Sequence, residues 1–317
     1  MGTEQLKRDQ RIYAYLRLAD QSQQLQFMLL PYSSNNRDIF ATQPMKLLFF
    51  PFLRVNSSKL KSCLNDKTVL ITGASYGIGE CLAMSLADTK AHLILVARTE
   101  DKLIEVKKNV ESRGGRADIF PCDLRNIQEM QILLQELHQL PDGIDIIVNN
   151  AGKSIRRSIF DSLDRLHDFT RTMNLNYLAP VQLMLSLIPI LVVRQGHTIN
   201  VSAVNVLLIP APKWSAYQAS KTAFDQWFRS VSPELNSRGV STTSIYLPLV
   251  RTRMIAPTKE YANMPAMEPE EVAKLICHAI ISRKRTYAPW WLLWGQLASA
   301  LFRWHWEVIT SKFSRYM

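Results

Sequence analysis

The sequence predicts an α/β fold with a doubly wound parallel sheet of about seven strands and helices on both faces. Short apolar runs alternate with helix-length segments between residues 66 and 288, which is typical of such a sheet. A glycine-rich turn joins the first apolar run to the first helix. The chain has 317 residues, 47% of them hydrophobic, enough for one sizeable core.

The glycine-rich turn follows the apolar run Val69–Ile71 in the spacing T-G-x-x-x-G-x-G. Glycines let backbone N–H groups approach a pyrophosphate, which the positive end of the next helix also attracts. Because a strand precedes the turn and a helix follows it, we expect a Rossmann-type dinucleotide site. Its candidate residues are Gly73, Ser75, Tyr76, Gly77, Ile78 and Gly79.

The end of the second strand, His92–Ala97, indicates which nucleotide binds. Arg98 follows it, and an arginine at this place pairs with a 2′-phosphate, whereas an acidic residue would accept from a ribose hydroxyl. The sequence therefore favours NADP(H) over NAD. Tyr76 departs from this pattern, because many NADP-binding proteins carry a basic residue there.

Later strand ends add further cofactor contacts. Asp123 follows the strand 117–121 and is expected at the adenine edge. The strand 143–148 is followed by Asn149-Asn150-Ala151-Gly152, whose small and amide side chains suit close approach to a cofactor, so Asn150, Ala151 and Gly152 are candidates. Strands are also expected at 197–201, 241–247 and 286–288, and helices at 126–140, 217–237 and 268–282. Residues 164–194 form a long helical stretch whose prolines predict a kink or a division.

Tyr217 and Lys221 are the candidate catalytic pair. They lie four residues apart at the start of a helix, so their side chains share one face. A phenol ordinarily titrates near pH 10, and a nearby ammonium is expected to lower that pKa and ease proton donation. Lys221 is also expected to bind the nicotinamide ribose.

The motifs T-G-x-x-x-G-x-G, N-N-A-G and Y-x-A-S-K occur in the order found in the short-chain dehydrogenase/reductase family, which residues 66–290 resemble. The longer strings AGKSIRRSIFDSLDRLHDFTRTMNLNY and STTSIYLPLVRTRMIAPTK resemble bacterial long-chain fatty acyl-CoA reductases and ketoacyl reductases. The resemblance implies that Tyr217 is the general acid, that Asn176 holds a relay water, and that Thr252 fixes the nicotinamide carboxamide.

One position departs from the family. Its carbonyl-polarising serine is usually the second of a Ser-Ser pair about thirteen residues before the tyrosine, but this chain has Ser202-Ala203, with Ala203 fourteen before Tyr217. Either Ser202 takes the role or the carbonyl loses one donor, which costs about 100-fold in comparable sites. We assign Ser202 as the fourth catalytic candidate.

The net charge of +11 lies at the two ends. Residues 1–65 hold nine Lys/Arg against four Asp/Glu, residues 283–317 hold six against one, and the middle holds 23 against 22. A nucleic-acid binder would carry a basic face on the folded domain, so no nucleic-acid partner is expected. The four cysteines are scattered and form no C-x-x-C pair, which indicates neither a disulfide framework nor a metal site and favours a reducing compartment.

The ends are predicted to be appendages of the domain at 66–288. Residues 1–65 are expected to be a poorly ordered basic extension with the short apolar run 47–53, which either touches a membrane or packs on the domain. Residues 289–317 hold five of the seven tryptophans beside basic residues, a pattern typical of a peripheral membrane contact. A helix over the substrate side or at a dimer face is the alternative, and a homo-oligomer is expected.

These observations predict a cytoplasmic, NADPH-dependent enzyme that reduces a carbonyl or thioester of a long-chain lipid, at the cytoplasmic face of a membrane if the tail binds there. The reaction is either fatty acyl-CoA to aldehyde or 3-ketoacyl reduction. The adjacent Arg156 and Arg157 either clamp a phosphate or thioester headgroup or are simply solvated. A slow NADP-binding scaffold or sensor at the membrane surface is the alternative, because alanine stands at the serine position.

Overall fold

The computed structural model describes residues 49–50, 54–256, 258, 261 and 263–313. All of these residues belong to one unit of the chain, residues 46–317. The expected poorly ordered extension up to residue 48 lies outside the described residues, as do residues 51–53 of the apolar run and the last four residues of the tail.

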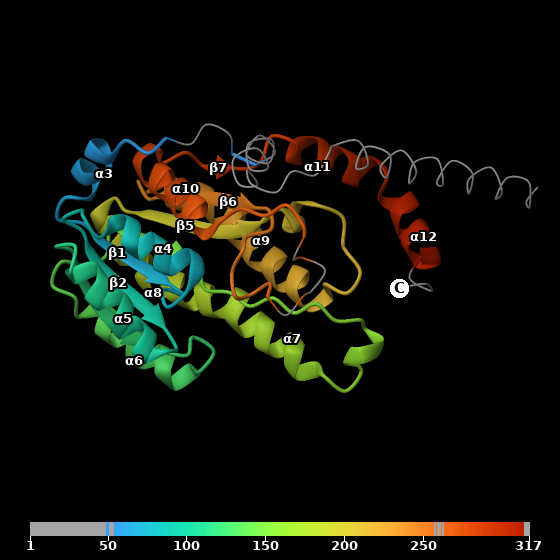
Figure 1. Cartoon of the computed structure of the whole chain (residues 1–317), viewed down its shortest axis with the longest axis horizontal. Helices are drawn as coiled ribbons and strands as arrows, with labels where there is room; N and C mark the ends of the chain where they lie inside the picture. The colour runs from blue at the N-terminus through green and yellow to red at the C-terminus, as the bar shows by residue number, and fades with distance from the viewer. Residues whose placement is uncertain (1–48, 51–53, 257, 259–260, 262, 314–317) are drawn as a thin grey trace, which may run out of the picture. The chain divides into compact units, whose positions relative to one another are not determined.

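Seven parallel strands form one sheet in the order β3-β2-β1-β4-β5-β6-β7, which confirms the predicted fold class (Figure 1). Chain order reverses between β1 and β4, and such a switch point is where open parallel sheets bind ligands, at the carboxyl ends of the strands. The strands are β1 Thr68–Thr72, β2 His92–Ala97, β3 Arg116–Pro121, β4 Ile146–Asn149, β5 His197–Ala203, β6 Ser241–Leu247 and β7 Thr286–Tyr287.

Helices cover both faces of the sheet because alternate strand side chains are apolar on each face. One core cluster joins the sheet to α3 (Ser57–Leu64), α4 (Gly77–Leu86), α5 (Glu100–Glu111) and α10 (Pro269–Ser282). The second joins the other face to α6 (Ile127–His138), α8 (Ala179–Arg194) and the end of α9 (Ser215–Ser237).

Helix α3 lies within residues that were expected to belong to the extension. Asn56 caps it by accepting from the Lys59 backbone N–H at 3.0 Å, and Leu60 and Leu64 are buried in the first core cluster. The folded domain therefore begins before residue 66, because two leucines one turn apart give this short helix an apolar face to bury.

The long helical stretch divides as expected, but at its asparagines. Helix α7 (Leu166–Met173) leads into a π-helical turn, Asn174–Leu178, and then into α8. Pro180 is in the first turn of α8, where proline is tolerated, and Pro189 lies inside α8 without ending it. Residues 166–194 are long and apolar enough to span a membrane, yet α8 supplies core residues of the domain, as a buried helix with the same composition would.

Two helices, α11 (Leu292–Leu301) and α12 (Arg303–Phe313), make up the described part of the tail. They contact the segment after the short 3-10 helix η3 (Val204–Leu207): Ser299 Oγ accepts from the Ile209 N–H at 3.2 Å, and Trp306 Nε1 donates to the Pro210 carbonyl at 3.3 Å. The tail therefore lies beside the loop that precedes α9, the helix that carries Tyr217 and Lys221.

Candidate active site

The glycine turn closes tightly on the chain that follows β4. Gly73 and Gly77 have φ of +69° and +59°, the left-handed region that favours glycine. A Cβ at Gly79 would lie 2.3 Å from the Gly73 carbonyl oxygen, and one at Gly73 would lie 3.0 Å from the Ala151 Cα. The turn therefore leaves its backbone N–H groups at the start of α4, where a pyrophosphate would bind.

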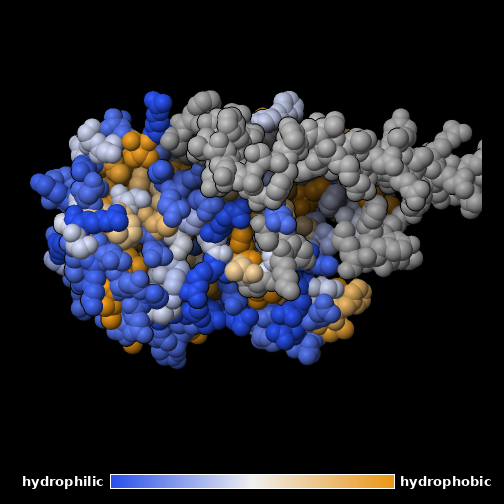
Figure 2. Space-filling view, in the orientation of Figure 1, coloured by the Kyte–Doolittle hydropathy of each residue, from blue (hydrophilic) through white to orange (hydrophobic). Residues whose placement is uncertain are grey.

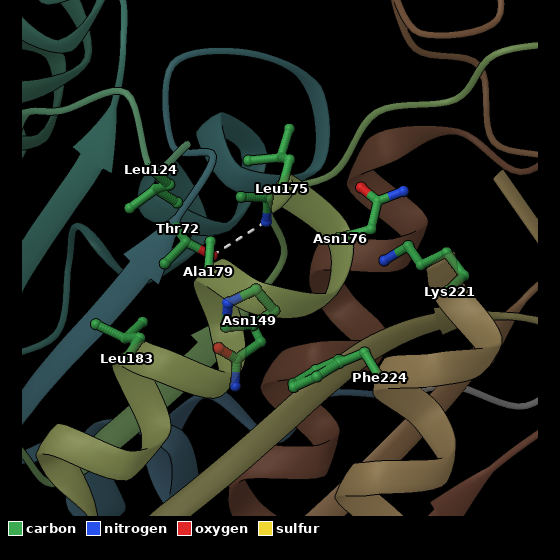
Figure 3. A pocket seen from close by; sticks show the side chains of 11 residues that line it. Thr72, Leu124, Asn149, Leu175, Asn176, Ala179, Leu183, Lys221 and Phe224 are labelled. Carbon is green, nitrogen blue, oxygen red and sulfur yellow. Dashed lines mark hydrogen bonds between the residues drawn. The ribbon is translucent and has the colours of Figure 1, made fainter. Parts of the chain in front are cut away.

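Thr72 joins the turn to the predicted Asn150–Gly152 segment, a role that sequence reasoning missed. Its hydroxyl accepts from the backbone N–H groups of Asn150 and Ala151, both at 3.0 Å, and donates to the Val148 carbonyl at 3.2 Å. Figure 3 shows the bond to Ala151 at the edge of the pocket. The signal was present, since this threonine opens the T-G motif.

Cations surround the place where an adenosine ribose would lie. Arg98 is exposed directly after β2. Hydrogen bonds from Arg125 hold the pKa of the Asp123 carboxyl below its ordinary value, and the charge of Arg98 acts in the same direction. The Arg253 guanidinium lies 4.1 Å from the centre of the Tyr76 ring, so a cation is present where Tyr76 departs from the expected basic residue.

The other residues predicted to bind the cofactor lie around this turn. Ser75 and Ile78 are half-buried, and Ile78 packs on the first core cluster. Thr252 lies over the turn, because a Cβ at Gly77 would be 3.2 Å from its Cγ2. Its backbone N–H donates to the Val250 carbonyl at 2.9 Å. The nicotinamide role of Thr252 stays a prediction.

Tyr217 lies in the first turn of α9, with its ring 5.5 Å from that of Trp214. Burial raises the pKa of its phenol to about 12. The expectation that Lys221 lowers this pKa is therefore wrong for this structure, because the loss of solvent outweighs any cationic neighbour. The phenol stays protonated at neutral pH, which suits a proton donor.

Lys221 is buried one turn further along α9. Its Nζ donates to the Val201 carbonyl at 3.0 Å, and it would be 3.6 Å from a Cβ at Gly152. Burial lowers the pKa of its ammonium to about 8, opposed by the charge of Asp225. Lys221 and the predicted Asn150–Gly152 segment therefore meet at the carboxyl edge of the sheet, one helical turn from Tyr217.

Asn176 is presented by the π-helical turn between α7 and α8. Its Oδ1 accepts from the Lys153 N–H at 2.8 Å, and its Nδ2 donates to the Lys153 carbonyl and to Ser220 Oγ, both at 2.9 Å. Figure 3 shows Asn176 and Lys221 side by side at one end of the pocket. Ser220, the residue before the lysine in Y-x-A-S-K, is a further contact that sequence reasoning missed.

Ser202 is not brought to this group. Its Oγ is buried and makes no hydrogen bond within the described residues. It shares a strand face with Asn200, whose Nδ2 reaches Asp225 at 3.4 Å. Burial raises the pKa of the Asp225 carboxyl, and the Ser202 hydroxyl is among the groups that oppose this. The hydroxyl therefore faces Asp225 beneath the site, and this geometry does not support the role expected for Ser202.

A pocket runs between the end of β1 and α9 (Figure 3). Its lining combines polar and apolar side chains, as in many ligand sites. The lining residues are Thr72, Leu124, Asn149, Ala151, Leu175, Asn176, Ala179, Pro180, Leu183, Lys221 and Phe224.

Residues 67–263 match the model of the short chain dehydrogenase family. A fatty acyl-CoA reductase from Acinetobacter baylyi is 48% identical over 226 residues, 71% of this chain and 76% of that protein. One from Mycobacterium tuberculosis is 40% identical over 241 residues, 75% and 82% of the two chains.

Solved structures agree on the fold. A short-chain dehydrogenase/reductase from Mycobacterium marinum has a TM-score of 0.64 at 26% identity, over 70% of this chain and 92% of that one. A metagenomic short-chain oxidoreductase in complex with NADP has a TM-score of 0.62 at 23% identity, over 71% and 96%. The predicted resemblance is confirmed, and the chain belongs to the short-chain dehydrogenase family of oxidoreductases.

Proposed function

We propose that this protein is an NADPH-dependent reductase of long-chain fatty acyl-CoA that forms the aldehyde, with 3-ketoacyl reduction as the second candidate reaction. The observation that carries the proposal is that Lys221 and Asn176 lie at Gly152 beside the glycine turn, with Tyr217 one helical turn from Lys221, in a chain 48% identical to a fatty acyl-CoA reductase. A ketoacyl reductase from Nostoc, 31% identical over 224 residues, favours the second candidate.

The residues present fit NADP(H). The glycine turn, which leads into the amino end of α4, would receive the pyrophosphate. Arg98, with Arg253 held against Tyr76, would pair with the 2′-phosphate. Lys221 would hold the nicotinamide ribose, Thr252 the carboxamide and Asp123 the adenine edge. When bound, the reduced nicotinamide supplies a hydride.

Side chains of this protein supply the proton and the positive charge that the reaction requires. Tyr217 donates its proton to the oxygen of the substrate carbonyl as negative charge develops there. The Lys221 ammonium, one helical turn away, adds positive charge on the same helix face, where it would hold the nicotinamide ribose. With a thioester this gives a hemithioacetal. Its carbon–sulfur bond then breaks as its hydroxyl loses the proton, so that the aldehyde forms and coenzyme A leaves as the thiol.

Purified protein with palmitoyl-CoA or a 3-ketoacyl thioester tests the proposal. We expect NADPH absorbance to fall with palmitoyl-CoA, together with formation of an aldehyde that hydroxylamine traps, and a much slower reaction with NADH. Consumption with the 3-ketoacyl thioester alone would select the second candidate. NADPH binding without consumption of any substrate would contradict both and leave the slow nucleotide-binding scaffold or sensor.

We also propose peripheral membrane contact through the tail. Leu293, Trp294, Leu301 and Trp304 are 60%, 64%, 74% and 76% exposed, and basic residues flank the two helices. Such a surface inserts apolar rings at the lipid interface, while each cation near an anionic surface adds about 1 kcal/mol. An acyl substrate would then reach the active site from the lipid side.

Co-sedimentation with anionic vesicles tests this contact. We expect the full chain to pellet at low salt and to be released at high salt, and the triple variant Trp294→Ser/Leu301→Ser/Trp304→Ser to remain in the supernatant. These side chains are exposed, so folding should be retained. Ile132→Ser on α6, equally exposed at 56%, is the control. Equal sedimentation of all three proteins would contradict the assignment.

A homo-oligomer is proposed on separate grounds. Leu178, Leu185 and Val193 are 50%, 62% and 83% exposed along one helical stretch, an apolar surface that a second copy could cover. Sedimentation velocity would give the mass directly, and a monomer at micromolar concentration would contradict the proposal.

A further inference from the structure

Asp168 is buried at the start of α7 and is surrounded by three arginines. Arg157 Nε lies 3.2 Å from Oδ2, Arg165 Nε 3.0 Å from the same oxygen, and one terminal nitrogen of Arg171 lies 3.0 Å from Oδ1. The Asp168 side chain is 2% exposed, while each arginine side chain remains about a third exposed. Within the described residues, Asp168 is the carboxylate with which these three pair, so the cluster carries an excess of two positive charges.

The positive charge continues toward the catalytic residues. Burial lowers the pKa of Lys153, and the charges of Arg171, Arg125 and Arg98 lower it further. Like charges placed this close destabilise the protein unless an anion shares them. A single arginine would have been enough to neutralise Asp168. Figure 2 shows hydrophilic side chains gathered over the region of α7.

A small pocket adjoins the cluster and the start of α9. Arg157, Asp168 and Lys213 line it together with Ser215 and Ala216, the first two residues of α9. Ala216 directly precedes the tyrosine that donates the proton. The pocket therefore combines the Arg157 guanidinium with the positive end of a 23-residue helix.

Residues 153–157 connect this pocket to the reaction site. At one end both backbone groups of Lys153 are bound by Asn176, at 2.8 and 2.9 Å. At the other end the Arg157 N–H donates to the Lys213 carbonyl at 2.8 Å. Four residues of extended chain span at most about 14 Å, so the two sites are near neighbours on one surface.

We propose that Arg157, Arg165 and Arg171 bind the phosphate groups of coenzyme A while its thioester lies at Tyr217. Guanidinium groups are suited to phosphate oxygens, which they bind in bidentate fashion, and Asp168 fixes their positions before the ligand arrives. In coenzyme A a flexible pantetheine arm separates the phosphates from the thioester. The two groups can therefore bind at two neighbouring sites. This assignment rests on the proposed function, and it names how the substrate is recognised.

The test compares two thioesters of the same acyl chain at saturating NADPH. For Arg171→Gln we expect KM for palmitoyl-CoA to rise about tenfold, as for one lost charge-assisted hydrogen bond. The N-acetylcysteamine thioester has no phosphate, so its KM should stay unchanged. Arg171→Lys should recover part of the loss. Arg116→Gln, an exposed arginine at the amino end of β3, is the matched control.

Calorimetry with coenzyme A alone on the NADP-loaded protein provides a measurement without turnover. We expect coenzyme A to bind the wild-type protein and to bind the Arg171→Gln variant about tenfold more weakly. Inorganic phosphate should compete with coenzyme A only weakly. A wild-type protein that binds coenzyme A but reduces no thioester would contradict the proposed function and leave this site standing. Equal KM changes for both thioesters, or coenzyme A binding unaffected by Arg171→Gln in a variant with unchanged melting temperature, would overturn the site.

Discussion

The nucleotide side and the substrate side of this domain are built differently. On the nucleotide side every residue of β1 and β2 is buried, and Gly73 and Gly79 allow backbone contacts that no side chain could fit. On the substrate side, Phe160 and Leu163 before α7 are 79% and 80% exposed, like the tail helices. The nucleotide side buries its apolar side chains within the domain. The substrate side instead exposes apolar and cationic groups that suit a lipid thioester and a membrane.

The largest expected effect tests the point where the two regions meet. Tyr217→Phe removes the proton donor but keeps the ring against Trp214, so we expect turnover to fall about a thousandfold and NADPH affinity to stay within threefold. Stopped-flow reduction and fluorescence titration measure the two quantities. Turnover near the wild-type rate would mean that another group delivers the proton.

Gly79→Ala tests how closely the nucleotide side is packed. Its Cβ would lie 2.3 Å from the Gly73 carbonyl oxygen, so the turn must shift, and we expect a loss of about 3 kcal/mol in unfolding free energy together with weaker NADPH binding. Denaturant unfolding measures the first quantity.

Gly114→Ala is the matched control for this substitution. Gly114 has φ of +83° but no atom within 4 Å of its Cβ position, so only about 1 kcal/mol of backbone strain is expected, with unchanged nucleotide affinity. Equal losses of unfolding free energy in the two variants would show that the backbone around Gly79 is not closely packed.

The charge of Lys221 gives a smaller effect that depends on pH. Its pKa is lowered to about 8, so the ammonium is present below pH 8 and is lost as the pH rises through that value. We expect kcat/KM to be flat from pH 6 to 7.5 and then to fall about tenfold per unit. The Tyr217 phenol, with a pKa of about 12, does not titrate in this range.

Asp225→Asn should move the alkaline fall in kcat/KM to lower pH, because the Asp225 carboxylate favours the charged form of Lys221. Asparagine is close to aspartate in shape, which limits damage to the contacts with Asn200 and Tyr246. If kcat/KM of this variant fell at the same pH as in the wild type, Asp225 would not affect the charge of Lys221.

The nucleotide side could be predicted from the sequence because its motifs are local. Gly73 and Gly77, or Tyr217 and Lys221, are close in the chain, and their spacing alone sets their geometry. The sequence singles out Arg157 as a candidate phosphate clamp, but its place beside Asp168 could not be found in this way, since Arg157 comes from a loop and reaches the carboxylate only when α7 packs beside it. The pKa of Tyr217 was mispredicted for a related reason, because the burial of its phenol depends on tertiary packing.

The smallest expected effect concerns Ser202. It tests whether this hydroxyl stabilises the negative charge that develops on the substrate oxygen. Its Oγ is inaccessible and faces Asp225, so Ser202→Ala should change kcat less than about threefold and leave KM unchanged. A lost oxyanion donor would instead cost about 100-fold. Ala203, half-buried at the end of β5, alternates to the other strand face, so Ala203→Ser tests whether a hydroxyl one residue later raises turnover. A 100-fold loss in Ser202→Ala would show that β5 rearranges when substrate binds and turns this hydroxyl toward the carbonyl.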